Sequence, residues 1–243
     1  MIREKRNKEK LKQYYHKFIN EGIVDPNVHP WVAESWQKSA AQGIDNIKMP
    51  KFPQLPKEEL LARQIKHARA IEFMDGLYEQ SKQHFNIYNL SMLFIDNEDY
   101  VIKNYALPFF QRVLEDVQGG NVGFETTGTS SISLVRDHGV PFLLFGPEMW
   151  IEESHSGDAC SVPIIIDGKL RYIINLFSLD QPDLPYDLVV SLLLSMKYSL
   201  EKYLTLQESL DDARLILDEL PQATYMLKSG GRVVYANKAG RAR

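Results

Sequence analysis

Helical periodicity dominates the first third of the chain. In residues 1–22 the pattern predicts a helix that stops at Gly22, with apolar positions at Leu11, Tyr14, Tyr15, Phe18 and Ile19. A second short helix is predicted over residues 30–41, before a connector that contains Pro50, Pro53 and Pro56. From residue 57 to about residue 82, the apolar side chains form one stripe at steps of three and four. This stripe predicts one long helix that packs on another part of the protein.

The period changes near residue 90, where strand patterns begin. Segments rich in β-branched and aromatic residues occupy residues 89–96, 99–106, 140–146, 159–168 and 169–179. The pair Asp167-Gly168 joins the last two and predicts a tight hairpin, because both residues tolerate the positive φ angles that such a turn requires. An antiparallel sheet is therefore expected.

Residues 186–220 predict a long helix with a heptad-like apolar repeat. The repeat positions are Val189, Leu192, Met196, Ser199, Tyr203, Leu206, Leu210, Ala213, Leu217 and Leu220. A repeat of this length favours a two-helix seam, and so a parallel homodimer. The alternative is that the same stripe packs on the chain's own sheet or on the helix at residues 57–82, and each half of the helix can follow a different alternative.

Composition restricts the class of protein. The 243 residues are 44% hydrophobic and 25% charged, which is typical of a globular fold, and the most apolar run, residues 188–194, is too short to span a bilayer. The net charge of −4 argues against direct contact with nucleic acid. The single cysteine, Cys160, allows no intrachain disulfide, and no signal sequence precedes the first helix, so a cytoplasmic location is expected.

Three stretches carry a family resemblance. They are V-H-P-W-V-A-E-S-W-Q-K-S at residues 28–39, E-T-T-G-T-S-S-I-S-L at residues 125–134, and G-P-E, C-S-V-P-I and D-G between residues 146 and 168. Together they resemble the N-terminal region of sigma-54-dependent transcription activators of the acetoin-catabolism regulator type. Ser130, Ser133 and Met149 stand where that family commonly has Asn, Gly and His. Residues 216–223 and 231–239 look like the first strands of a PAS domain.

The resemblance implies an α+β fold of the GAF type, in which helices flank a central antiparallel sheet with a ligand pocket on one face. It also implies an organisation along the chain: a helical segment at 1–56, a sensory domain at 57–185, a signalling and dimerisation helix at 186–220, and the start of a PAS-like domain at 221–243. The phosphate-loop pattern G-x-x-x-x-G-K-[ST] is absent from the sequence. We therefore expect the ATPase, the DNA-binding domain and the contact with sigma-54 RNA polymerase to lie in further domains of a longer protein.

Candidate ligand-binding residues follow from the family resemblance and from the pattern of polar and apolar residues along the chain. They are Phe124, Glu125, Thr126, Thr127, Phe145, Trp150, His155, Cys160 and Asn175. Residues 125–129 can open a helix whose free N–H groups bind a small molecule, but capping of the helix alone explains the same residues. Asn175 is an amide inside an apolar strand, so it faces a ligand, a protein partner or solvent.

Other kinds of chemistry have weaker support. His155, Cys160 and the more distant His138 include metal-ligand types, but their spacing fits no compact metal motif. No nucleophile or acid–base pair stands out, so we expect no enzymatic activity and no cofactor. The predicted function is small-molecule sensing, and the alternatives are a ligand-free dimerisation module and a metal- or gas-sensing GAF domain.

Overall fold

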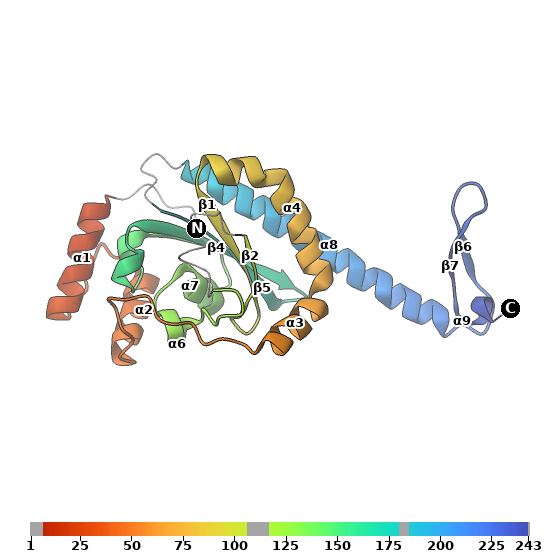
Figure 1. Ribbon diagram of the computed structural model, residues 1–243, viewed down its shortest axis with the longest axis horizontal. Helices are drawn as coiled ribbons and strands as arrows, with labels where there is room; N and C mark the ends of the chain where they lie inside the picture. The colour runs from red at the N-terminus through yellow and green to blue at the C-terminus, as the bar shows by residue number, and fades with distance from the viewer. Residues whose placement is uncertain (1–6, 106–116, 180–184, 243) are drawn as a thin grey trace. The chain divides into compact units, whose positions relative to one another are not determined.

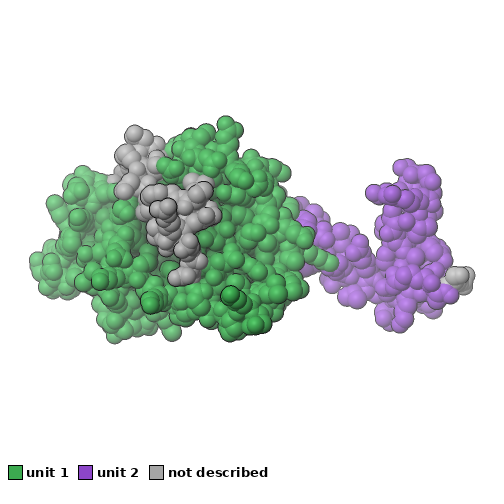
Figure 2. All heavy atoms as spheres, viewed as in Figure 1, with its two compact units in different colours: residues 1–200 green, residues 201–243 purple. Residues whose placement is uncertain are grey.

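A computed structural model describes residues 7–105, 117–179 and 185–242 of the chain. It contains two compact units, residues 1–200 and residues 201–243, which Figure 2 colours separately. Among the described residues, no helix combines the length and the apolar composition that a membrane crossing requires. The division between the units falls inside a helix, and the predicted domain bounds after residues 56, 185 and 220 stay predictions.

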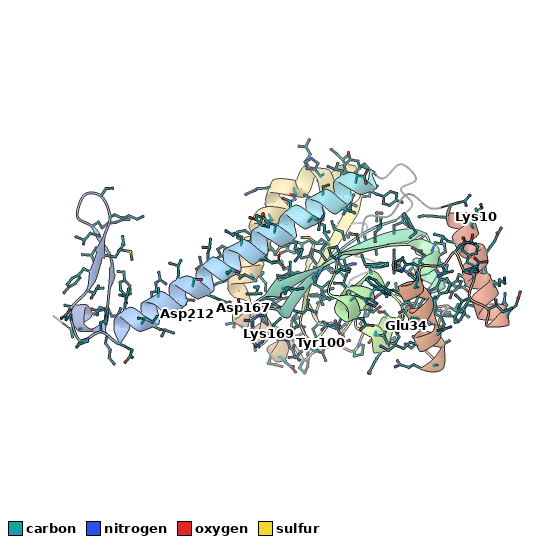
Figure 3. All side chains as sticks on the ribbon, turned by 180° about the vertical axis from the view of Figure 1, so that it is seen from behind. Lys10, Glu34, Tyr100, Asp167, Lys169 and Asp212 are labelled. Atoms are coloured by element: carbon teal, nitrogen blue, oxygen red, sulfur yellow. The ribbon has the colours of Figure 1, made fainter. Side chains whose placement is uncertain are left out.

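The first unit is built on a five-stranded antiparallel sheet in the order β2-β1-β5-β4-β3. The strands are β1 (Leu90–Asp96), β2 (Val101–Tyr105), β3 (Phe142–Phe145), β4 (Gly157–Ile166) and β5 (Lys169–Leu179). The hairpin between β4 and β5 turns at Asp167 and Gly168, whose φ angles are +50° and +71°; Figure 3 labels Asp167 at this turn. The predicted α+β fold, its sheet and this hairpin are confirmed.

Helices cover both faces of the sheet (Figure 1). On one face, Tyr78 of α4 (Ala68–Ile87) packs 4.9 Å from the Tyr105 ring, and Val189 of α8 (Tyr186–Asp218) lies beside Leu176. On the other face lies α7 (Ser131–His138), which contacts β3, β4 and β5. Because side chains alternate along a strand, Ile173, Asn175 and Phe177 of β5 face α7, and Ile174 and Leu176 face the opposite side of the sheet.

The N-terminal helices belong to the same core as the sheet. They are α1 (Lys8–Glu21), which ends at Gly22 in the left-handed conformation, and α2 (Pro30–Ala41). The predicted stop at Gly22 and the predicted helix over residues 30–41 are confirmed, and residues 1–6 of the first prediction lie outside the described residues. Their buried side chains join the core with residues of the sheet and of α7, and the N-terminal contributors are Tyr15, Phe18, Val28, Val32 and Trp36.

The helix predicted at residues 57–82 is interrupted at His67. The chain forms α3 (Lys57–Lys66) and α4, and His67 between them has φ −104° and ψ +14°, with its Nδ1 2.8 Å from the Tyr172 hydroxyl. In α4 the side chains of the predicted stripe are buried or half-buried, whereas in α3 Leu61 and Ile65 are 57% and 68% exposed. The prediction of one continuous helix is wrong. The polar side of α3 holds α3 to the sheet, because Arg63 pairs with Asp96 at 2.8 Å.

The long helix α8 differs between its two halves. In residues 186–200, it packs within the first unit through Val189, Val190, Leu193, Met196 and Leu200. This half of the helix therefore follows the alternative prediction, in which the apolar side chains pack on the chain's own sheet. In the second unit, four large apolar side chains of the helix are exposed, Leu206, Leu210, Leu215 and Ile216. The predicted homodimer through residues 186–220 stays a prediction.

The second unit continues from α8 into a small hairpin. It holds β6 (Tyr225–Leu227), β7 (Val233–Ala236) and α9 (Lys238–Arg241). Asn237 is its buried centre: the side-chain amide donates to the carbonyl oxygens of Leu217 and Gln222, at the end of α8 and just beyond it, and its oxygen accepts from the N–H of Gly240. The start of a PAS-like domain stays a prediction.

Candidate functional site

A cavity of about 230 Å³ opens between the α7 face of the sheet and the segments around it. Most of its wall is apolar, from Met49, Phe52, Leu93, Val117, Val122, Ile132, Met149, Ile151, Ala159 and Phe177. Polar groups enter at Thr127, Thr129, Ser130, Ser131, Glu153, Ser154, Ser156, Asp158, Asn175 and Ser178. Small-molecule sites typically have this composition, an apolar cavity with a few placed polar groups.

A glycine positions the wall segment between α6 (Phe124–Thr127) and α7. Gly128 has φ +64° and ψ −140°, a conformation that is nearly exclusive to glycine. A Cβ atom at this position would lie 2.7 Å from the Trp150 ring, so the chain also needs the small size of glycine here. The turn directs the backbone into α7, and Ser130 then caps that helix reciprocally with Ser133.

Most hydroxyl groups of this segment already have protein partners. Thr127 donates to the carbonyl oxygen of Gly123 at 3.2 Å, and Thr129 donates to Ser35 Oγ at 2.8 Å. The Thr129 N–H also donates to Ser39 Oγ at 3.1 Å. These bonds join the cavity wall to α2 and to its own backbone. They are not the predicted helix capping, because α6 has no side-chain cap and the hydroxyl of Thr127 donates to a carbonyl oxygen.

A buried polar cluster joins the sheet to α7 at the cavity. The Asn175 amide nitrogen donates to Ser131 Oγ at 3.0 Å and to Ser161 Oγ at 2.9 Å, and the two serine oxygens lie 2.9 Å apart. Asn175 is 4% exposed, Ser131 1% and Ser161 not at all. Because Asn175 and Ser131 also line the cavity, this cluster presents polar atoms to an otherwise apolar space.

An acidic group connects the cavity with the first turn of α8. Asp158 of β4 is buried and accepts from the Gly146 N–H and from Lys8 Nζ, each at 2.9 Å. Its other oxygen accepts from the hydroxyl of Tyr186, the first residue of α8. Burial, and then the bond to this carboxylate, raise the pKa of Tyr186, so the phenol stays protonated and donates.

The structure brings only two of the predicted ligand-binding residues to the cavity wall, Thr127 and Asn175. Glu125 is exposed, and the Lys38 ammonium group lies 4.1 Å from the centre of the Phe124 ring. Thr126 of the same short helix lies outside the lining. Any role of these three residues in ligand binding stays a prediction.

The other four predicted residues also lie outside the lining of the cavity. Trp150 donates its indole N–H to the Ile44 carbonyl, and His155 lies 2.9 Å from the Met149 carbonyl, with its pKa lowered by burial. Phe145 packs against the Tyr186 ring. Cys160 lies on the opposite face of the sheet, toward Val189, and burial raises the pKa of its thiol to about 12. The thiol is therefore neutral and packs as a small apolar group.

Several residues of the site were missed at the level of sequence. Ser161 and Asp158 lie in an apolar strand, so the argument that selected Asn175 would also have selected them. Met49 and Phe52 come from the proline-containing connector, where no periodic pattern marks the residues that point inward. His155, Cys160 and His138 do not converge, and among the described residues no group of three or more His, Cys, Asp or Glu is arranged to hold a metal ion.

Comparisons with known proteins show the fold. No protein-family model matches the chain, and no curated protein matches its sequence. In structure it is similar to a chain of the crystal structure of the E. coli DhaR(N)-DhaL complex, with a TM-score of 0.65 and 14% sequence identity. The match covers 88% of this chain and 76% of that chain. At this identity, the similarity shows that the two chains share a fold.

Proposed function

We propose that the chain is the small-molecule-sensing region of a bacterial sigma-54-dependent transcription activator, with a GAF-type domain that signals to a downstream ATPase and DNA-binding domain. The cavity is the observation that carries this proposal, because its apolar walls meet a buried Asn-Ser cluster. The motifs at residues 28–39 and 125–134 support the regulator class. The proposed role is reversible binding without chemical conversion.

The contact between Asp158 and Tyr186 gives the proposed signal a route. An effector in the cavity touches Asp158, whose carboxylate holds the first residue of α8. If the effector binds more tightly to one arrangement of this contact, it shifts the population of α8 toward that arrangement. The shift in free energy between the two arrangements is no larger than the difference between the effector's binding free energies to them.

Thermal unfolding across a panel of small alcohols, carbonyl compounds, carboxylates, aromatic compounds and divalent metal salts tests the proposed sensing function. An effector present at a hundred times its dissociation constant stabilises the native state by about 2.7 kcal/mol, and so raises the midpoint by several degrees. The variant Ala159→Phe fills the cavity, because Ala159 lies in its wall. We expect this variant to lose the shift.

The matched control is Ile87→Phe, at a position that is 59% exposed and outside the cavity. It should keep the shift. A compound that stabilises Ala159→Phe as much as the natural chain binds elsewhere and contradicts the assignment of the site. A shift with metal salts alone would support metal sensing, and no shift with any compound would support the ligand-free dimerisation module.

A further inference from the structure

The hydrogen bonds of the Asn175 cluster leave one donor and one acceptor without a partner. Asn175 carries two amide hydrogens and each serine one hydroxyl hydrogen, whereas the cluster contains three hydrogen bonds. One serine hydrogen therefore has no acceptor within the cluster. Among the described residues, no group donates to Asn175 Oδ1. Leaving both groups unpaired in a buried site is unfavourable, so the cluster is suited to a ligand group that both donates and accepts.

The orientation of the Asn175 amide follows from the same network. If its oxygen and nitrogen were exchanged, both serine hydroxyls would have to donate to the amide oxygen. No hydrogen would then remain for the serine pair, whose oxygens lie 2.9 Å apart. The orientation that leaves Oδ1 free satisfies more hydrogen bonds and is therefore favoured.

The remaining lining residues determine the polarity and the size of the part of the ligand that lies away from the Asn175 cluster. Leu93, Val122, Ile132, Ile151 and Phe177 offer apolar contact only. An apolar cavity of about 150 Å³ holds one benzene molecule. By proportion, the cavity of about 230 Å³ holds a molecule of about nine non-hydrogen atoms.

The charges in the wall disfavour an anion. The ionisable side chains of the described lining are those of Glu153 and Asp158, both of which are carboxylates. Asp158 is already paired with Lys8, so it does not call for a cationic ligand. A ligand carboxylate would instead meet like charge in a partly desolvated site, which weakens binding.

We propose that the cavity binds a neutral alcohol or phenol of about nine non-hydrogen atoms, whose hydroxyl group donates to Asn175 Oδ1 and accepts from the Ser131–Ser161 pair. This proposal rests on the proposed sensing function and specifies its ligand class. Such a ligand has one polar end and an apolar body, unlike a short diol or a dicarboxylate.

Titration calorimetry on the chain with four probes of similar shape tests the ligand class. The probes are 2-phenylethanol, ethylbenzene, phenylacetate and 2-phenylethylammonium. We expect 2-phenylethanol to bind about tenfold more tightly than ethylbenzene, because one buried hydrogen-bonded hydroxyl is worth about 1.4 kcal/mol. Phenylacetate should bind more weakly than either neutral probe. Equal binding of the two neutral probes, or tightest binding of either ion, would overturn the proposal.

Two variants separate recognition by Asn175 from a purely structural role. In Asn175→Leu, which keeps the approximate side-chain volume, the preference for 2-phenylethanol over ethylbenzene should fall to about onefold, while ethylbenzene still binds. Ile174→Val is the matched control, since Ile174 is the neighbouring residue on β5 and faces the opposite side of the sheet. It should keep the tenfold preference. Ser131→Ala should reduce the preference for 2-phenylethanol in part. This variant replaces Asn175→Leu in the test if Asn175→Leu does not fold.

The outcomes distinguish the two proposals. If none of the four probes binds but another compound of the thermal panel binds in the cavity, the ligand class is wrong and the sensing function stands. If Asn175→Leu keeps the tenfold preference, the assignment of the hydroxyl to this cluster is wrong. If no compound binds at all, both proposals fail.

Discussion

Replacing Gly128 by alanine will lower the free energy of unfolding by roughly 3 kcal/mol or more. Two effects add at this position. The backbone has φ +64° and ψ −140°, which an L-residue adopts only with strain. The new methyl group would also lie 2.7 Å from the Trp150 ring, which is itself buried at 3% exposure and cannot easily move away.

Gly139→Ala is the matched control for this prediction. Gly139 has nearly the same φ angle, +66°, but no atom lies within 4 Å of the position its Cβ would occupy. Only the left-handed backbone is then unfavourable, at a cost of about 1–2 kcal/mol. Urea unfolding of both variants gives the comparison. Equal losses would mean that Trp150 does not pack against the turn and would contradict the described wall of the cavity.

Replacing Trp36 by alanine will lower the free energy of unfolding by about 3–5 kcal/mol. Trp36 of α2 is 1% exposed, stacks on Phe18 at 5.6 Å, and donates its indole N–H to the Glu148 carbonyl oxygen at 2.9 Å. The substitution removes these contacts between α1, α2 and the segment that follows β3. The measurement is the midpoint and slope of urea unfolding, followed by circular dichroism.

Trp31→Ala is the internal control in the same helix. Trp31 is only half-buried, and its ring stacks on His138 at 3.8 Å. Its loss should cost clearly less than the loss of Trp36, because fewer contacts are removed. If both variants unfold at the same urea concentration as the natural chain, the N-terminal helices do not share a core with the sheet.

Local signals in the sequence predicted the local elements well. The Asp167-Gly168 turn, the end of α1 at Gly22 and the five strands each depend on residues that are close together in the chain. The interruption at His67 was not predictable in this way. It depends on contacts with distant residues, the Tyr172 hydroxyl for His67 and Asp96 for Arg63, which override the continuous helical periodicity.

The candidate site was predicted only in part, for a related reason. Asn175 was found because an amide inside an apolar strand requires a partner, and the structure supplies Ser131 and Ser161. Cys160 was selected from a motif without knowledge of its side of the sheet, and a shift of one position along a strand reverses the face. The connector residues Met49 and Phe52 reach the cavity through tertiary folding alone.

Amide hydrogen exchange tests the central claim most directly, namely that a ligand in the cavity acts on α8. The exchange is measured with and without the panel compound that raises the unfolding midpoint most, in the natural chain and in Tyr186→Phe. The account predicts slower exchange in residues 127–132 and 157–161 and in the first turns of α8, with the effect on α8 reduced in Tyr186→Phe because the bond to Asp158 is lost. Slower exchange at the cavity wall with no change in α8, or the same change in both proteins, would contradict it.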